Sequence, residues 1–76
     1  MGDSWPSLRA SDLERIIRRH CGQPIRQSGS HRIYKGKHKK FTFAYHNGDE
    51  VGGNMVRRVL VNDVGLTPQD ARGEVS

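Results

Sequence analysis

The sequence predicts a small α+β domain of order α-β-β-β-α, with a three-stranded antiparallel sheet carrying two helices on one face. Three observations predict it. Apolar residues recur at helical spacing towards both ends, aromatic and small residues alternate between them, and each break has its own turn or cap residues. The 76 residues form a single domain, 1–76, with an ordered core over about residues 8–70.

The first helix is predicted over Asp12–Cys21, after an irregular lead at residues 1–7. Ser11 stands three residues before Glu14, which is the spacing of a capping box at a helix start. An apolar stripe of helical period then follows. The stripe consists of Leu13, Ile16, Ile17, His20 and Cys21.

Three short extended segments are predicted next, at Ile25–Gln27, His31–Lys35 and Lys40–Tyr45. Turn-forming residues at 28–30 and a basic loop at 35–39 separate them. Alternation places side chains two residues apart on one face of a strand. Which face is buried depends on the pairing register, which the sequence leaves open.

A second helix is predicted from near Asn54, a good N-cap residue, and Gly65 ends it. Thr67-Pro68 has the form of a further helix start, but the residues after it are polar and few. We therefore expect a frayed tail from Ala71. The double-stranded-RNA-binding-domain fold has this overall order of elements.

The charge distribution indicates a polyanionic or acidic partner, because the net charge is +5 and the pI is near 10. Nine Lys and Arg residues and no Asp or Glu lie between Arg15 and Gly48. A hairpin that is merely solvated normally mixes both signs of charge. We therefore expect phosphate contacts here, with Tyr34 and Tyr45 as candidate base-stacking residues, of which at least one is expected to pack in the core. The candidate RNA-binding residues are Ser28, Gly29, Ser30, Arg32, Tyr34, Lys35, Lys37, Lys39 and Lys40.

His31 is the candidate catalytic residue, because it follows a Gly-Ser turn at the start of a strand amid positive charge. An imidazole at such a place can take a proton from a ribose 2′-hydroxyl near neutral pH, and the reaction needs no metal. The alternative is a strand histidine with a structural role only. Cys21 and the four histidines lack the spacing of a zinc site, so no metal or other cofactor is expected.

No export signal or membrane-spanning run is visible, and the lone cysteine suits a reducing compartment, so a cytoplasmic protein without membrane contact is expected.

Two motifs are specific enough to compare with known families. The first is Gly29-Ser30-His31 followed by an apolar-aromatic pair, and the second, independently placed, is Gly65-Leu66-Thr67 after a helix. With these motifs the chain resembles the HicA (YcfA-like) toxins over about residues 8–70. The chain departs from the family at Gly52-Gly53, where a Pro-rich loop is common, and in lacking an acidic-aromatic C-terminal helix.

The resemblance implies a bacterial mRNA interferase of a type II toxin-antitoxin system with a double-stranded-RNA-binding-domain fold. It implies that His31 is catalytic, that single-stranded mRNA is the substrate and that a HicB-like antitoxin is the partner. It also implies that operator DNA is reached only through the antitoxin. Two other classes stay open: a non-catalytic RNA-binding module, and a protein that meets only an acidic protein. An exposed His31 beside the basic hairpin would favour RNA over the last of these.

Overall fold

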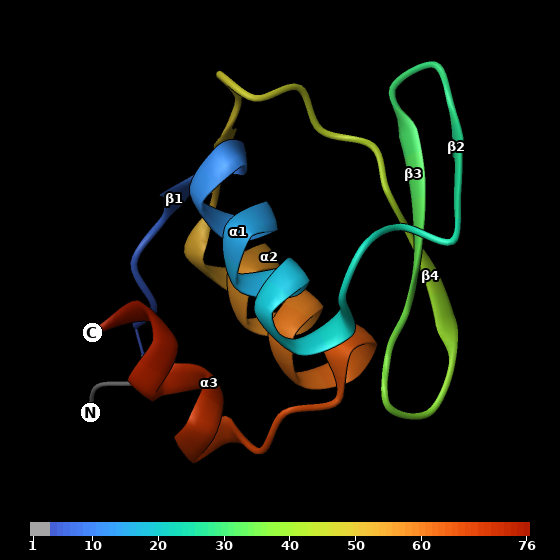
Figure 1. Ribbon diagram of the computed structural model, residues 1–76. Helices are drawn as coiled ribbons and strands as arrows, with labels where there is room; N and C mark the ends of the chain where they lie inside the picture. The colour runs from blue at the N-terminus through green and yellow to red at the C-terminus, as the bar shows by residue number, and fades with distance from the viewer. Residues whose placement is uncertain (1–3) are drawn as a thin grey trace.

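The computed structural model describes residues 4–76 and confirms the predicted α-β-β-β-α order. The helices lie together on one side of the three-stranded sheet (Figure 1). Two very short strands and a third helix are added to the prediction. The elements are β1 (Leu8–Arg9), α1 (Ala10–Cys21), β2 (Arg26–Ser28), β3 (His31–Lys35), β4 (Lys40–Phe43), β5 (Glu50–Val51), α2 (Gly53–Arg58), a π-helical segment η1 (Val59–Val64) and α3 (Pro68–Val75).

The sheet has the strand order β2-β3-β4 with antiparallel pairing throughout. Tyr34 lies opposite Phe41, and Arg32 lies opposite Phe43. Tyr34 and both phenylalanines are buried, so this face of the sheet packs against the helices. The helices complete the core with Ala10, Leu13, Ile16, Ile17, Val56, Val59, Leu60, Val64 and Ala71.

Helix α1 begins at Ala10, two residues before the predicted start, and the predicted capping box is wrong. Ser11 lies inside the helix, and the N-cap residue, Arg9, makes no side-chain cap. Backbone carbonyls of the segment between β4 and β5 satisfy the first amides instead. The Ala10 amide donates to Asp49 O at 2.8 Å, and the Ser11 amide donates to Asn47 O at 3.2 Å. Glu14 is therefore free to turn towards the sheet.

The strands β1 and β5 form a two-residue antiparallel ribbon, which pairs Leu8 with Val51. A strand of two residues shows no alternation of apolar and polar residues, so neither strand could be predicted from the sequence. The predicted lead at 1–7 is irregular over its described part until β1 begins, and Trp5 packs against the core. Residues 1–3 of that lead lie outside the described residues.

Helix α2 begins at Gly53 without a side-chain cap, so Asn54 is not the N-cap. The chain continues through the π-helical η1 to Gly65, whose φ of 96° ends it as predicted. The loop between β3 and β4 docks on this end, since the Lys37 amide donates to Val64 O at 2.9 Å. Gly36 is required there, because a Cβ atom would collide with the carbonyl of Asp63.

The predicted frayed tail is wrong, because residues 68–75 form helix α3. Thr67 caps it by accepting a hydrogen bond from the Asp70 amide at 3.0 Å. Ala71 is fully buried, and Glu74 pairs with Arg19 and His20 on α1. These contacts supply the stabilisation that local propensity lacks. None of the helices in residues 4–76 is long and apolar enough to cross a bilayer.

Candidate nucleic-acid interface

His31 lies exposed on the open face of the sheet, beside a tight turn. It pairs with Ser28 across a two-residue loop, Gly29-Ser30. Gly29 has a φ of 60°, and no other type of residue in 4–76 has a positive φ. A glycine at the first loop position matches a type II′ hairpin turn. The turn therefore fixes the point at which the imidazole leaves the backbone.

Arg32 points in the opposite direction and holds this turn from behind. Its Nη1 donates to Ser30 O at 3.1 Å, and its Nη2 donates to Tyr45 O at 2.8 Å. Its Nε donates to Glu14 Oε2, and the guanidinium lies 5.6 Å from the centre of the Phe43 ring. One planar group thus joins the residue before His31, the segment that follows β4, and α1. Because the Arg32 side chain is only 12% exposed, a direct phosphate contact by Arg32 is not available in this arrangement.

Tyr34 is fully buried, so its expected role as a base-stacking residue does not fit the structure. Its hydroxyl donates to Glu14 Oε2 at 2.5 Å and accepts from Arg18 Nε at 3.0 Å. Burial, followed by the hydrogen bond to Glu14, raises the pKa of the Tyr34 phenol above its ordinary value. The phenol therefore stays protonated at neutral pH and acts as a donor inside the fold.

Lys35 and Lys40 lie directly opposite each other on the open face, and both are exposed. Arg26, on β2, pairs with Ile33 and faces the same side. Like charges opposed across strands destabilise a sheet unless an anion lies between them. The face that carries His31 is therefore suited to a polyanion.

The other predicted basic residues differ in whether an acidic side chain lies beside them. Lys39 Nζ lies 3.2 Å from Asp63 Oδ1, so its charge is partly neutralised by η1. Lys37 is exposed in the same loop. Ser28 and Gly29 are exposed, and Ser30 is half-buried. The arginines of α1 do not join the open face, because that helix packs on the other side of the sheet (Figure 1). The exposed residues of the candidate interface are Arg26, Ser28, Gly29, His31, Lys35, Lys37 and Lys40.

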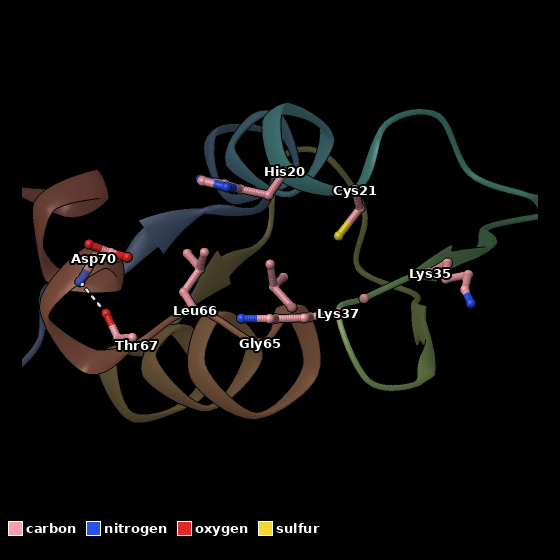
Figure 2. A pocket seen from close by; sticks show the side chains of 10 residues that line it. His20, Cys21, Lys35, Lys37, Gly65, Leu66, Thr67 and Asp70 are labelled. Atoms are coloured by element: carbon pink, nitrogen blue, oxygen red, sulfur yellow. Dashed lines mark hydrogen bonds between the residues drawn. The ribbon is translucent and has the colours of Figure 1, made fainter.

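A pocket of about 360 Å³ lies at the far end of α1, lined by His20, Cys21, Lys37 and the residues after η1. Figure 2 shows Cys21 pointing towards Lys37 and Gly65, whereas Lys35 points away from the other lining side chains. Burial raises the pKa of the Cys21 thiol, which disfavours a reactive thiolate. His31 does not line this pocket, whereas Lys35 and Lys37 do.

Two positions have contacts that the sequence does not predict. The sequence predicts a capping role for Glu14, although Glu14 lies one turn before Arg18 and beside the apolar stripe, a position that favours partial burial. Asn47 is predicted only as a loop residue, and its contact with α1 has no local signal. In residues 4–76, no group of three or more His, Cys, Asp or Glu side chains could hold a metal ion.

Comparison with known proteins gives one family. The family model described as "HicA toxin of bacterial toxin-antitoxin" matches residues 10–66, which include the sheet, α1, α2 and η1. No curated protein and no solved structure matches the chain.

Proposed function

The chain belongs to the HicA toxin family of bacterial toxin-antitoxin systems, and from this premise we propose that it is an endoribonuclease that cleaves mRNA and so stops translation. The observation that carries the proposal is the placement of His31. Its imidazole is exposed on the open face, at a tight turn held by Arg32 and on the same face as Lys35 and Lys40. A general base near phosphate-binding cations is what this chemistry requires.

In the proposed reaction His31 takes the proton from a ribose 2′-hydroxyl. The 2′-oxygen attacks the adjacent phosphorus, and the bond from phosphorus to the 5′-oxygen of the next nucleotide breaks. The leaving oxygen takes up a proton, so the products are a 2′,3′-cyclic phosphate and a 5′-hydroxyl. The attack is intramolecular and the base is a side chain, so the proposed step uses no metal. Lys35, Lys40 and Arg26 would hold the backbone phosphates.

The test is cleavage of a labelled single-stranded RNA by the purified chain in the presence of EDTA. We expect 2′,3′-cyclic ends from the wild type, and for His31→Ala a rate lower by about 10²–10⁴, the usual contribution of a general base. His38→Ala is the matched control, because His38 is an exposed histidine of the same hairpin. Equal rates for wild type and His31→Ala, or a strict need for added metal, would contradict the proposal.

A non-catalytic RNA-binding module is the second candidate, and the opposed Lys35–Lys40 pair favours it equally. The two functions separate in one experiment. A binding module retains RNA at low salt and leaves it intact, and its affinity is the same with and without the His31 imidazole.

As a member of the family the chain has an antitoxin partner. We propose that this partner is a HicB-like protein that covers the open face, and that operator DNA is reached only through it. Arg26, Lys35 and Lys40 form no ion pair within residues 4–76, which supports an acidic contact surface on the antitoxin.

A further inference from the structure

A second pocket, of about 310 Å³, lies between the first turns of α1 and the segment that joins β4 to β5. In Figure 1 this segment runs from the sheet across the start of α1 to β5. Its position is fixed by the backbone bonds from Ala10 and Ser11 to Asp49 and Asn47. Every side chain that lines the pocket is polar or charged. The lining residues are Ser11, Glu14, Arg15, Arg18 and Asn47.

Glu14 contributes an acceptor that the fold does not use. Its side chain is only 8% exposed, and it is the one buried charged residue in residues 4–76. Its contacts to Arg32, to Tyr34 and, at 3.8 Å, to Arg18 all involve Oε2. Oε1 has no partner within residues 4–76. Since no fully buried side-chain oxygen in that range lacks a partner, Oε1 must keep some solvent-accessible surface, and Glu14 lines the pocket.

The charges around Oε1 restrict the ligand that it would accept. Arg18 lines the pocket, Arg32 lies behind the carboxylate, and Arg15 is an exposed cation at the rim. A cationic ligand would be repelled by these guanidinium groups. A neutral N–H donor would suit Oε1, and an attached anion would suit the arginines. A nucleobase with an amino group, on its phosphate backbone, has both properties.

We propose that this pocket is a base-recognition subsite, which takes an RNA base with an exocyclic amino group through a hydrogen bond to Glu14 Oε1. The inference rests on the proposed function, in that RNA is the ligand. The volume is at the lower end of small-ligand sites and suits one base. Uracil fits less well, because its single Watson–Crick N–H lies between two carbonyl oxygens that would face the carboxylate.

The subsite is linked to the catalytic turn by a single side chain. Arg32 donates both to Glu14 Oε2 and to the carbonyl of Ser30, the residue before His31. For one RNA strand to use both sites, it would have to cross the end of the sheet where β3 begins. The base in the pocket would then belong to a nucleotide near the cleaved bond and would select where cleavage occurs.

Glu14→Gln tests the proposal sharply, because the neighbours dictate how the amide must lie. Arg32 and Tyr34 both donate, so the glutamine oxygen has to take the place of Oε2. Its NH₂ group then occupies the place of Oε1 and offers a donor to the pocket. The base preference is therefore expected to shift towards uracil, whose carbonyl oxygens accept.

The measurement is the affinity for oligo(A), oligo(C) and oligo(U) of equal length, by fluorescence anisotropy, in the cleavage-deficient His31→Ala background. We expect oligo(A) or oligo(C) to bind about tenfold more tightly than oligo(U), the scale of one good base contact. Adding Glu14→Gln is expected to abolish or reverse this ratio. Glu50→Gln, which removes an exposed carboxylate outside the pocket, is the control and leaves the ratio unchanged.

Circular dichroism of each variant checks that it folds. If Glu14→Gln does not fold, Ser11→Phe fills the pocket from its rim and is expected to remove the base preference while phosphate affinity persists. Equal binding of the three oligonucleotides by the wild-type pocket, or an equal change for all three on Glu14→Gln, would overturn the subsite alone. Absence of any RNA binding would instead contradict the proposed function and the subsite with it.

Discussion

His31 and Arg32 are neighbours in the sequence and serve opposite faces of the sheet. His31 is exposed on the open face, whereas Arg32 is held by three acceptors on the helix side. This division follows from the alternation of side chains along β3. At this scale the proposed catalytic group depends on its neighbour for position, because Arg32 fixes the carbonyl of Ser30 just before it.

Arg32→Lys is expected to slow RNA cleavage while the chain still folds. Lysine keeps the charge but cannot reach Glu14, Ser30 and Tyr45 together, since it lacks the planar fork. A loosened turn misplaces the base, and such misplacement costs on the order of 10²-fold in rate. Single-turnover cleavage measures this. Arg26→Lys, an exposed change on the same sheet, serves as the control, and equal rates for the two variants would show that Arg32 does not position His31.

Tyr34→Phe is expected to lower the free energy of unfolding by about 1–2 kcal/mol, because Glu14 and Arg18 both lose a hydrogen-bond partner. RNA affinity is expected to stay the same, since the ring is buried. Urea denaturation and RNA titration measure the two quantities. Tyr45→Phe is the matched control, and a loss of RNA affinity specific to Tyr34→Phe would show that the Tyr34 hydroxyl contributes to RNA binding.

Only part of the candidate site could be predicted from the sequence. The position of His31 directly after a turn could be predicted, because Gly29 is a residue type that favours turns and here has a positive φ. The face on which His31 lies was not readable, since alternation alone leaves two choices. The choice is made by Tyr34 and Phe41, which pack against helices distant in sequence. Glu14 could not be assigned for the same reason.

Among the helices and strands, the predicted bounds agree with the structure where turn-forming residues mark both ends of a segment. Strand β3 has the predicted bounds, because turn residues delimit it on both sides. The helix α3 is the opposite case. Its local sequence is weak, and it is formed through burial of Ala71 and through the contacts of Glu74 with α1. Non-local stabilisation of this kind is not visible in a short polar segment.

The attachment of α3 is expected to weaken in acid. Arg19 first, and then His20, hold the pKa of Glu74 below its ordinary value of 4.5, so the folded state favours the ionised carboxylate. The resulting stabilisation is present above that ordinary value, and it is lost as the pH falls through the lower folded value. Glu74→Gln is therefore expected to be less stable than the wild type at pH 7, by a gap that is smaller at pH 3.

Urea denaturation at both pH values measures this difference. Asp70→Asn, which neutralises an exposed carboxylate on the same helix, is the control. If the stability gap between wild type and Glu74→Gln were the same at both pH values, the ion pairs with Arg19 and His20 would not be the cause.

At the scale of the whole molecule, the two sides of the sheet differ in charge. The described acidic residues lie on the helices, on β5 and in the loops, and β2, β3 and β4 carry none. The exposed cations of β2, β3 and β4 therefore act together on the open side. If Arg26, Lys35, Lys37 and Lys40 contact four phosphates of a single strand, log K should fall with log salt at a slope of about −2.8.

Replacing Lys35 and Lys40 together by alanine is expected to reduce the magnitude of this slope by about 1.4. Affinity falls by a similar factor for all sequences, because phosphate contacts carry no base information. Titrations at several salt concentrations measure both effects. Arg57→Ala with Arg58→Ala, two exposed changes on α2, is the control pair, and an unchanged slope in the sheet variant would show that the open face is not the RNA surface.

The same charge asymmetry predicts how the antitoxin acts. A partner that carries acidic residues is drawn to the open side, and this attraction speeds association at low salt. RNA and antitoxin then need the same cations around His31, so they cannot be bound together.

We expect the purified antitoxin, titrated into a complex of RNA with the His31→Ala variant, to release the RNA with a one-to-one endpoint. The Lys35 and Lys40 double variant should associate with the antitoxin more slowly and lose most of the salt dependence. A ternary complex of stable composition would show instead that the antitoxin binds elsewhere on the fold and acts on the open face from a distance.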